Sequence, residues 1–241
     1  MTQLEKSSTT TPFCKVCFKD VRRYDSASLF EDYPICPTCF NSMEPKTVVT
    51  VLDGIKATSL FVYNDKVKQM LYQCKGCFDY EMAEVFLSRH KSFLRRKYKG
   101  WTLVPAPSYG SKDEVRGFNH VVEIFKGLER PFIHAIEKID NVKQADLNFI
   151  ERQQIGKHLA WKDGVSVTGL NILFVDDLLT TGATAKACAK MLLDHEANKV
   201  EILVMARTVD PEKRKENKIS FSQKLRQIVD GIKKKIRVER N

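Results

Sequence analysis

The sequence has no long hydrophobic run. None of its stretches approaches the ~18 consecutive apolar residues that a membrane-spanning helix needs, and the polar first segment, Met1–Thr11, lacks the apolar core of a secretory signal peptide. Internal repeats and low-complexity tracts are also absent. The 241 residues, 43% hydrophobic and 29% charged, have the balance of a globular domain. We therefore expect a cytoplasmic protein with a disordered leader over residues 1–11.

Four of the seven cysteines have the spacing of a metal site. Cys14-x₂-Cys17 and Cys36-x₂-Cys39 are separated by 18 residues, and two such pairs complete a closed tetrahedral Zn²⁺ site. A closed site is structural, because no coordination position remains for a substrate. Residues 12–45 hold too few apolar side chains for a core of their own, so metal binding would offset the chain entropy of this module. Free or redox-active cysteines are the alternative.

Three further cysteines are harder to assign. Cys74-x₂-Cys77 lies in a helical pattern, where both thiols would share one face and could serve as metal ligands. We prefer the interpretation that they are small, partly buried residues that pack against a neighbour. Cys188 is expected to lie in the core.

The apolar segments predict an open α/β sheet over residues 46–211. Helical spacing covers Asp65–Leu94, with a break near Lys75-Gly76, and also Gly117–Leu128 and Ala183–Leu193. Between and around these segments are short strand-like runs at Leu60–Tyr63, Trp101–Val104, Ile172–Val175 and Val200–Met205. Strands that alternate with helices form parallel crossovers, so the sheet should be mostly parallel with helices on both faces. Ligands of such sheets bind beyond the carboxyl ends of the strands.

The strongest chemical signal is the segment Asn171–Ala185, NILFVDDLLTTGATA. A buried strand ends in the carboxylates of Asp176 and Asp177, which could accept hydrogen bonds from vicinal ribose hydroxyls or hold Mg²⁺ through water. A threonine- and glycine-rich turn then opens a helix, where free N–H groups and hydroxyls can bind an anion. The alternative is a strand end with solvated acids and a threonine-rich cap. No Gly-Lys-Thr/Ser follows, so the segment is not a Walker A loop.

This segment resembles the signature of the type I phosphoribosyltransferases: an apolar run, two acids, two apolar residues and T-T-G-x-T. A second match is Val104–Ser108, directly after a strand. The resemblance implies that the acids grip the ribose hydroxyls, that the Thr/Gly loop cradles the 5′-phosphate, and that the second loop lies on the diphosphate. The implied ligand is phosphoribosyl diphosphate with Mg²⁺, and the implied ligand-binding residues are Asp176, Asp177, Thr180, Thr181, Gly182, Ala183, Thr184, Ala106, Pro107 and Ser108.

From about Cys14 to Arg207 the chain is similar to the ComF family of bacteria that take up DNA. The paired cysteine knuckles ahead of the phosphoribosyl loop carry the resemblance, together with Tyr63–Asp65, Arg116–Asn119 and Gln144–Arg152. Three positions depart from the family pattern: His120 replaces a glutamine, Ile155 replaces an asparagine, and the glycine after Lys75 is displaced. The resemblance implies a competence accessory role in DNA uptake and natural transformation, alongside the helicase ComFA.

A basic stretch is a candidate nucleic-acid contact. Arg89–Lys99 places six Lys and Arg residues among Phe93 and Tyr98. Interleaved cations and rings suit single-stranded DNA through phosphate contacts and base stacking, and the residues we predict to bind it are Arg95, Arg96 and Lys97. An ordinary solvated helix end explains the stretch equally well.

The last 30 residues, 212–241, carry most of the excess charge. Eleven Lys and Arg against four Asp and Glu give +7 of the chain's net +10. Apolar residues from Phe221 to Ile236 recur on one face, which predicts a basic amphipathic helix. Its target is open between its own domain, a partner, DNA and the inner face of the cytoplasmic membrane, where the protein would then be peripheral.

Three functions remain open on the sequence. The first is a DNA-uptake accessory that binds single strands and partner proteins, with phosphoribosyl diphosphate as ligand or regulator. The second is a working phosphoribosyltransferase whose acceptor the sequence does not name. The third is a nucleic-acid-binding zinc protein with a degenerate fold, which would bind no nucleotide sugar.

Overall fold

A computed structural model describes residues 13–21, 34–108, 110–139 and 158–208. These residues, apart from Thr208, belong to a unit that ends at Arg207. The predicted leader, the predicted basic tail and the family stretch Gln144–Arg152 lie outside the described residues.

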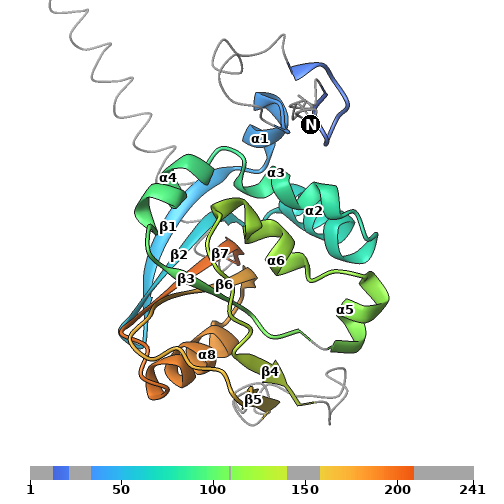
Figure 1. Cartoon of the computed structure of the whole chain (residues 1–241). Coiled ribbons are helices and arrows are strands. Elements are labelled where there is room, and N and C mark those ends of the chain that lie inside the picture. Colours follow the sequence, from blue (N-terminus) through green and yellow to red (C-terminus); the bar gives the residue numbers. More distant parts are fainter. Residues whose placement is uncertain (1–12, 22–33, 109, 140–157, 209–241) are drawn as a thin grey trace, which may run out of the picture. The chain divides into compact units, whose positions relative to one another are not determined.

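A five-stranded sheet in the order β1-β2-β7-β6-β3 forms the centre of the domain (Figure 1). Three of its four strand pairings are parallel, namely β2–β7, β7–β6 and β6–β3. Strand β1 runs antiparallel to its neighbour β2. The strands are β1 (Pro45–Leu52), β2 (Ile55–Val62), β3 (Thr102–Pro105), β6 (Asn171–Leu179) and β7 (Lys199–Arg207).

The hairpin of β1 and β2 is an element that the apolar pattern did not predict. Its two-residue turn is Asp53-Gly54, and both residues have positive φ, 49° and 82°. An Asp-Gly pair suits this turn because Gly and Asp tolerate the left-handed region, and the resulting twist matches that of the strands. Strand β1 escaped prediction because it lies mostly in solvent, with Val49 and Val51 exposed.

Helices cover both faces of the sheet. Alternate residues of β6 point to opposite sides: Leu173 and Val175 join one buried cluster, and Ile172 and Phe174 join the other. The first cluster lies under α2 (Asp65–Gly76), α3 (Ala83–Leu87), α4 (Lys91–Lys97) and α6 (His120–Phe125) with the short turns η3 (Tyr80–Met82) and η4 (Lys126–Leu128). The second lies under α8 (Ala183–Asp194). The predicted fold class, a mostly parallel open sheet with helices on both faces, is confirmed (Figure 1).

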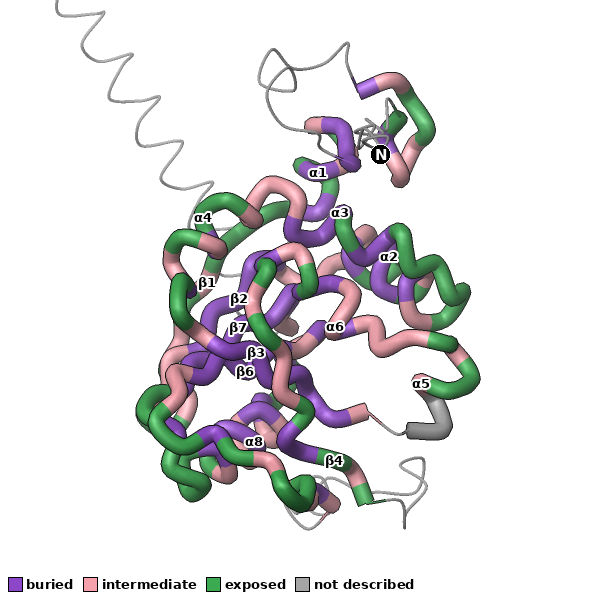
Figure 2. Tube along the Cα trace, viewed as in Figure 1, coloured by how far each residue is buried: buried purple, intermediate pink, exposed green. Residues whose placement is uncertain are grey.

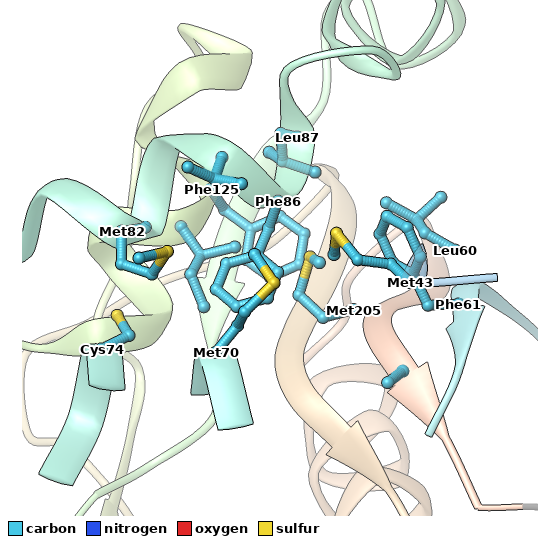
Figure 3. Packing of buried hydrophobic residues seen from close by; sticks show 14 of the residues in the cluster. Met43, Leu60, Phe61, Met70, Cys74, Met82, Phe86, Leu87, Phe125 and Met205 are labelled. Atoms are coloured by element: carbon cyan, nitrogen blue, oxygen red, sulfur yellow. The ribbon is translucent and has the colours of Figure 1, made fainter. Parts of the chain in front are cut away.

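Methionine and phenylalanine side chains contribute to the packing of the first cluster. Figure 3 shows Met70, Phe86 and Phe125 between the helices and the sheet, and Met43 beside Phe61. Unbranched methionine side chains fill the irregular space between helices and strands that do not pack in parallel rows. Buried residues follow the sheet and the inner faces of these helices in Figure 2.

The cysteine-rich segment shares this core. Cys14, Ile35 and Phe40 belong to the same buried cluster as the side chains of α2 and α3. The short helix α1 (Pro37–Ser42) provides Phe40, whose ring meets that of Phe61 edge to face at 5.9 Å. The segment is therefore packed onto the sheet domain rather than held by its cysteines alone.

The helix predicted over Gly117–Leu128 is present in shorter form as α6 and the η4 turn that follows it, and α5 is a further helix that was not predicted. Helix α5 (Gly110–Arg116) ends before Gly117, which has φ of 78° and so takes the left-handed conformation that ends helices. Helix α6 begins after Asn119, whose side-chain oxygen accepts a hydrogen bond from Val122 N at 3.0 Å. A small second sheet pairs β4 (Ile136–Lys138) with β5 (Leu159–Trp161).

Of the helices that lie in the described ranges, none combines the length and apolar character needed to cross a membrane.

The two-sided burial of β6 predicts a large stability loss from its truncation. Leu173→Ala should lower the free energy of unfolding by about 2–5 kcal/mol, because it leaves a cavity beneath the helices. The matched change Leu193→Ala, at a leucine 43% exposed on α8, should alter it by less than about 0.5 kcal/mol. Urea titration followed by circular dichroism measures both. Equal losses would contradict the burial of this strand face.

Candidate functional site

A cavity of about 500 Å³ lies beyond the carboxyl ends of β3 and β6. Two predicted loops meet there, the one that follows β3 and the one that ends β6. Six of the ten predicted ligand-binding residues line it, namely Ala106, Pro107, Ser108, Asp176, Asp177 and Thr184. The other four are not part of the cavity wall: Thr180, Thr181 and Gly182 form the turn between β6 and α8, and Ala183 is the first residue of α8.

The turn after β6 has the geometry of an anion site. Gly182 has φ of 77°, directly before the first residue of α8. A side chain at this position would be strained by that conformation, and its Cβ would lie 3.2 Å from Leu52 Cδ1. Thr181 Oγ1 accepts a hydrogen bond from Ala183 N at 3.3 Å. The turn therefore leaves the first backbone N–H groups of a 12-residue helix close to the cavity, where the helix dipole favours negative charge.

The carboxylate of Asp177 is bonded to side chains from two helices, α2 and α6. Its Oδ2 atom accepts hydrogen bonds from Lys75 Nζ at 2.8 Å and from His120 Nε2 at 3.2 Å. The other ring nitrogen of His120, Nδ1, lies 3.1 Å from Arg116 Nη1. Because a guanidinium only donates, Nδ1 must accept, and the proton of a neutral His120 is therefore on Nε2, facing Asp177.

Adjacent acids at the end of β6 have opposite pKa shifts. Burial, followed by the nearby charge of Asp177, raises the pKa of Asp176 to about 8. Burial also raises the pKa of Asp177, but the hydrogen bond from His120 and the charge of Lys75 outweigh it and hold that pKa below its ordinary value. Two buried carboxylates this close do not both ionise readily. Near neutral pH the pair therefore carries about one negative charge, with a proton on Asp176.

Asp113 joins the loop after β3 to the start of α6. It accepts hydrogen bonds from Arg116 Nη1 at 3.0 Å and from Asn119 Nδ2 at 2.8 Å, and the Ser108 hydroxyl also contacts it. Arg116 Nε donates to the backbone oxygen of Lys75 at 3.0 Å. These bonds fix the relative positions of α2, α5 and the loop after β3.

Sequence reasoning also assigned no role to the basic residues of this cavity. They are Lys75, Arg116, His120 and Lys138, which add hydrogen-bond donors to its wall. Three of them were noted only as part of family stretches or as departures. The wall thus combines cationic and acidic side chains.

The four N-terminal cysteines converge. The sulfur atoms of Cys14, Cys17, Cys36 and Cys39 all lie within 4.8 Å of one another, and the Cys17–Cys36 distance is 3.8 Å. Zinc–sulfur bonds of ~2.3 Å in a tetrahedron place the sulfurs about 3.8 Å apart, so the cluster has the size of a metal site. Burial raises the pKa of Cys36 and of Cys39, so metal binding would displace protons from these thiols.

The remaining cysteines lie apart from this group. Cys74 and Cys188 are buried, and Cys77 is exposed at the end of α2. Within the described part of the chain, the group of four is the only cluster of metal-ligating side chains.

The three predicted DNA contacts on α4 differ in their surroundings. Arg95 Nε donates to Gly127 O at 2.8 Å and its guanidinium pairs with Glu129, so this side chain ties α4 to η4. Lys97 Nζ lies 4.7 Å from the ring centroid of Tyr98. Arg96 is exposed.

The opposite pKa shifts predict opposite effects of two substitutions on stability. A raised folded-state pKa means that the folded protein loses stability as pH rises from about 4 to about 8. Asp176→Asn removes that ionisation and should therefore raise the melting temperature relative to wild type more at pH 9 than at pH 6. Asp177→Asn should lower the melting temperature at pH 7, because Lys75 and His120 lose their charged partner. This decrease in melting temperature should become smaller below about pH 4.

Thermal unfolding across this pH range, with Asp194→Asn at the exposed end of α8 as control, measures both effects. A stabilising Asp177→Asn at pH 7 would contradict the assignment of the charge to that residue.

Two curated proteins match the chain in sequence. The competence protein ComFC of Bacillus subtilis (strain 168) is 34% identical over 138 residues, which cover 56% of this chain and 57% of that protein. The competence protein ComFC of Streptococcus pneumoniae is 29% identical over 156 residues, which cover 64% of this chain and 69% of that protein. The match thus spans little more than half the length of the first relative. No family model matches the chain.

Solved structures with some likeness are phosphoribosyltransferases. A hypoxanthine phosphoribosyltransferase from Staphylococcus aureus has 14% identity and a TM-score of 0.37, over 55% of this chain and 76% of that one. A hypoxanthine-guanine phosphoribosyltransferase from Bacillus anthracis has 18% identity and a TM-score of 0.35, over 55% and 73%. These scores are too low to support an inference about the ligand. The sequence matches confirm that the chain resembles the ComFC competence proteins, as its motifs predicted.

Proposed function

We propose that this protein is a competence accessory protein, which serves DNA uptake and natural transformation and binds phosphoribosyl diphosphate in the cavity beyond β3 and β6. One observation carries the ligand assignment. The loop after β3 and the end of β6, far apart in the sequence, line one cavity of about 500 Å³ with cationic side chains from α2, α5 and β4.

Each part of the ligand has a matching group. Asp176 and Asp177 would bind the ribose hydroxyls, and Asp176 would donate as well as accept when it carries a proton. Thr184 and the free N–H groups at the start of α8 suit the 5′-phosphate. The loop Ala106–Ser108 with Lys75 and Arg116 suits the diphosphate, whose charge these cations would balance. Mg²⁺ would arrive with the ligand and be held through its phosphates.

An active phosphoribosyltransferase is the second candidate. The observation that favours it is the set of cations in the cavity wall, because such groups can stabilise the charge of a departing diphosphate. The acceptor is then a base or amine that enters the same cavity. Incubation with phosphoribosyl diphosphate, Mg²⁺ and a panel of bases and amines separates the two candidates: ribosylated product identifies a transferase, and ligand binding without product identifies an accessory protein.

The proposed partners are those that a competence role would require. Single-stranded DNA, the competence helicase ComFA and the cytoplasmic face of the membrane fit a competence role. The net charge of +10 agrees with an acidic surface as the target.

We also propose that the four-cysteine cluster holds one structural Zn²⁺. The cluster offers four thiol ligands and no open coordination position, which is the arrangement of structural rather than catalytic zinc. Its side chains belong to the buried core with α2 and α3, so the ion would stabilise the attachment of the segment to the sheet domain.

The ribose assignment predicts a loss of affinity. The double substitution Asp176→Asn and Asp177→Asn should weaken phosphoribosyl diphosphate binding at least tenfold, since a hydrogen bond to a charged group contributes about 1.5–3 kcal/mol. Titration calorimetry with Mg²⁺ measures it, with Asp194→Asn as a control of equal charge change. Unchanged affinity in a folded double variant would refute the site.

The zinc assignment predicts a metal content that depends on one thiol. Wild-type protein should contain one Zn²⁺ per chain by elemental analysis, and Cys36→Ser should contain much less, because the closed site loses a ligand. Cys77→Ser, at an exposed cysteine outside the cluster, is the matched control and should keep its zinc. Loss of zinc in the control alone would move the site to α2.

A further inference from the structure

Four aromatic side chains form a rim beside the cavity: Tyr72, Phe78, Tyr80 and Phe118. Tyr72, Phe78 and Tyr80 are 63%, 51% and 55% exposed, and Phe118 is half-buried. They come from α2 (Tyr72), the turn after it (Phe78), η3 (Tyr80) and the segment between α5 and α6 (Phe118). The end of α2 and the segment between α5 and α6 lie side by side in Figure 1, and the rings of Tyr80 and Phe118 are in contact. Single exposed rings are common on soluble proteins, but a group of rings marks an interaction site.

Direct contacts join this aromatic rim to the cavity. Tyr72 itself lines the cavity, and its ring covers Gly76, where an added Cβ would lie 2.8 Å from the ring. At the other end, Tyr80 meets Phe118 edge to face, with ring centroids 6.3 Å apart. Arg116 connects the two ends, because its guanidinium carbon lies 5.9 Å from the Phe118 ring centroid and its Nε donates to Lys75 O.

The backbone holds Phe78 in an uncommon conformation. Its φ is 60°, which aromatic residues rarely adopt. Main-chain hydrogen bonds fix the turn around it: Cys77 N donates to Tyr72 O at 3.1 Å, and Asp79 N donates to Gln73 O at 3.2 Å. The exposure of this ring is therefore built into a fixed turn.

The acids near the rim already have partners. Asp79 Oδ1 accepts a hydrogen bond from Met82 N, and Lys15 pairs with both Glu81 and Glu84. The cations Lys75 and Arg116 line the cavity, where Lys75 pairs with Asp177 and Arg116 with Asp113. Beyond these bonds, an ammonium and a guanidinium have further N–H donors. An occupant of this surface should therefore offer planar rings to the aromatic side chains and oxygen acceptors to these donors.

We propose that the aromatic rim stacks the bases of single-stranded DNA and leads the strand across the mouth of the cavity. Aromatic side chains next to cations bind single strands in this way, because every base has a π-face and every linkage has a phosphate. The inference rests on the proposed competence function and gives its DNA ligand a site. That site is the rim, distinct from the basic helix α4.

Shared use of the cavity mouth has a thermodynamic consequence. Tyr72 belongs both to the rim and to the cavity wall, so a strand stacked on it lies next to phosphoribosyl diphosphate bound inside. Ligands in contact change each other's affinity, and the factor is the same in both directions.

Fluorescence anisotropy with a labelled 20-mer of thymidylate tests the rim. Phe78→Ala and Tyr80→Ala should each weaken strand binding roughly fivefold or more, as expected for a lost stacking contact. The matched control is Phe93→Ala on α4, where the ring is 56% exposed, and it should bind like wild type. Phe78 and Tyr80 are outside the cavity wall, so phosphoribosyl diphosphate affinity and melting temperature should stay unchanged in both variants.

The outcomes separate this inference from the proposed function. Loss of strand affinity in Phe93→Ala alone would overturn the rim and move the strand to α4, with DNA binding intact. If the affinity for the strand stayed unchanged when phosphoribosyl diphosphate and Mg²⁺ are added, the inference that the two ligands are in contact at Tyr72 would be wrong. A wild-type protein that binds phosphoribosyl diphosphate but no strand would refute DNA binding itself and the rim with it.

Discussion

The arrangement of the site depends on the charge of one buried carboxylate. Asp177 lies at the end of the central strand β6 and is only 9% exposed, so its charge is costly unless partners surround it. The partners come from two helices, Lys75 from α2 and His120 from α6. Both helices are thereby held over the carboxyl end of the sheet, and Arg116 fastens them to each other through Lys75 O and His120. The charge at the end of β6 thus fixes the positions of α2 and α6 beside the cavity.

The local patterns of the sequence were sufficient for the sheet and for half of the site. Buried strands such as β6 are continuous apolar runs, and the Thr/Gly turn follows directly, so one short segment contains both the strand and the acids at its end that line the cavity. The convergence of the four cysteines was also predictable, because each Cys-x₂-Cys pair is a local pattern in the sequence. Strand β1 was not predicted from the sequence, because an exposed edge strand has no apolar run of its own.

The rest of the site depends on long-range contacts that no local pattern encodes. Lys75 is 102 positions from its partner Asp177, and His120 is 57 positions from it. On a sequence, Lys75 is one cation among many on a helix, and only the packing of α2 against the sheet brings it to an acid. Arg95 shows the reverse: within a basic stretch it suggested a DNA contact, whereas in the fold it bonds to Gly127 O and Glu129.

The hairpin of β1 and β2 limits how the protein can be engineered. Its turn is exposed and short, and such turns are the usual places for peptide tags, fluorophores or inserted domains. Here, however, Leu52 packs against Gly182 at the start of α8, and Asp53 pairs with Lys186 at 3.3 Å. An insertion at Asp53-Gly54 would therefore disturb the Thr/Gly turn between β6 and α8. The exposed turn at Asp163-Gly164 lies between β5 and β6 rather than beside the start of α8, and it is the better place for a reporter group.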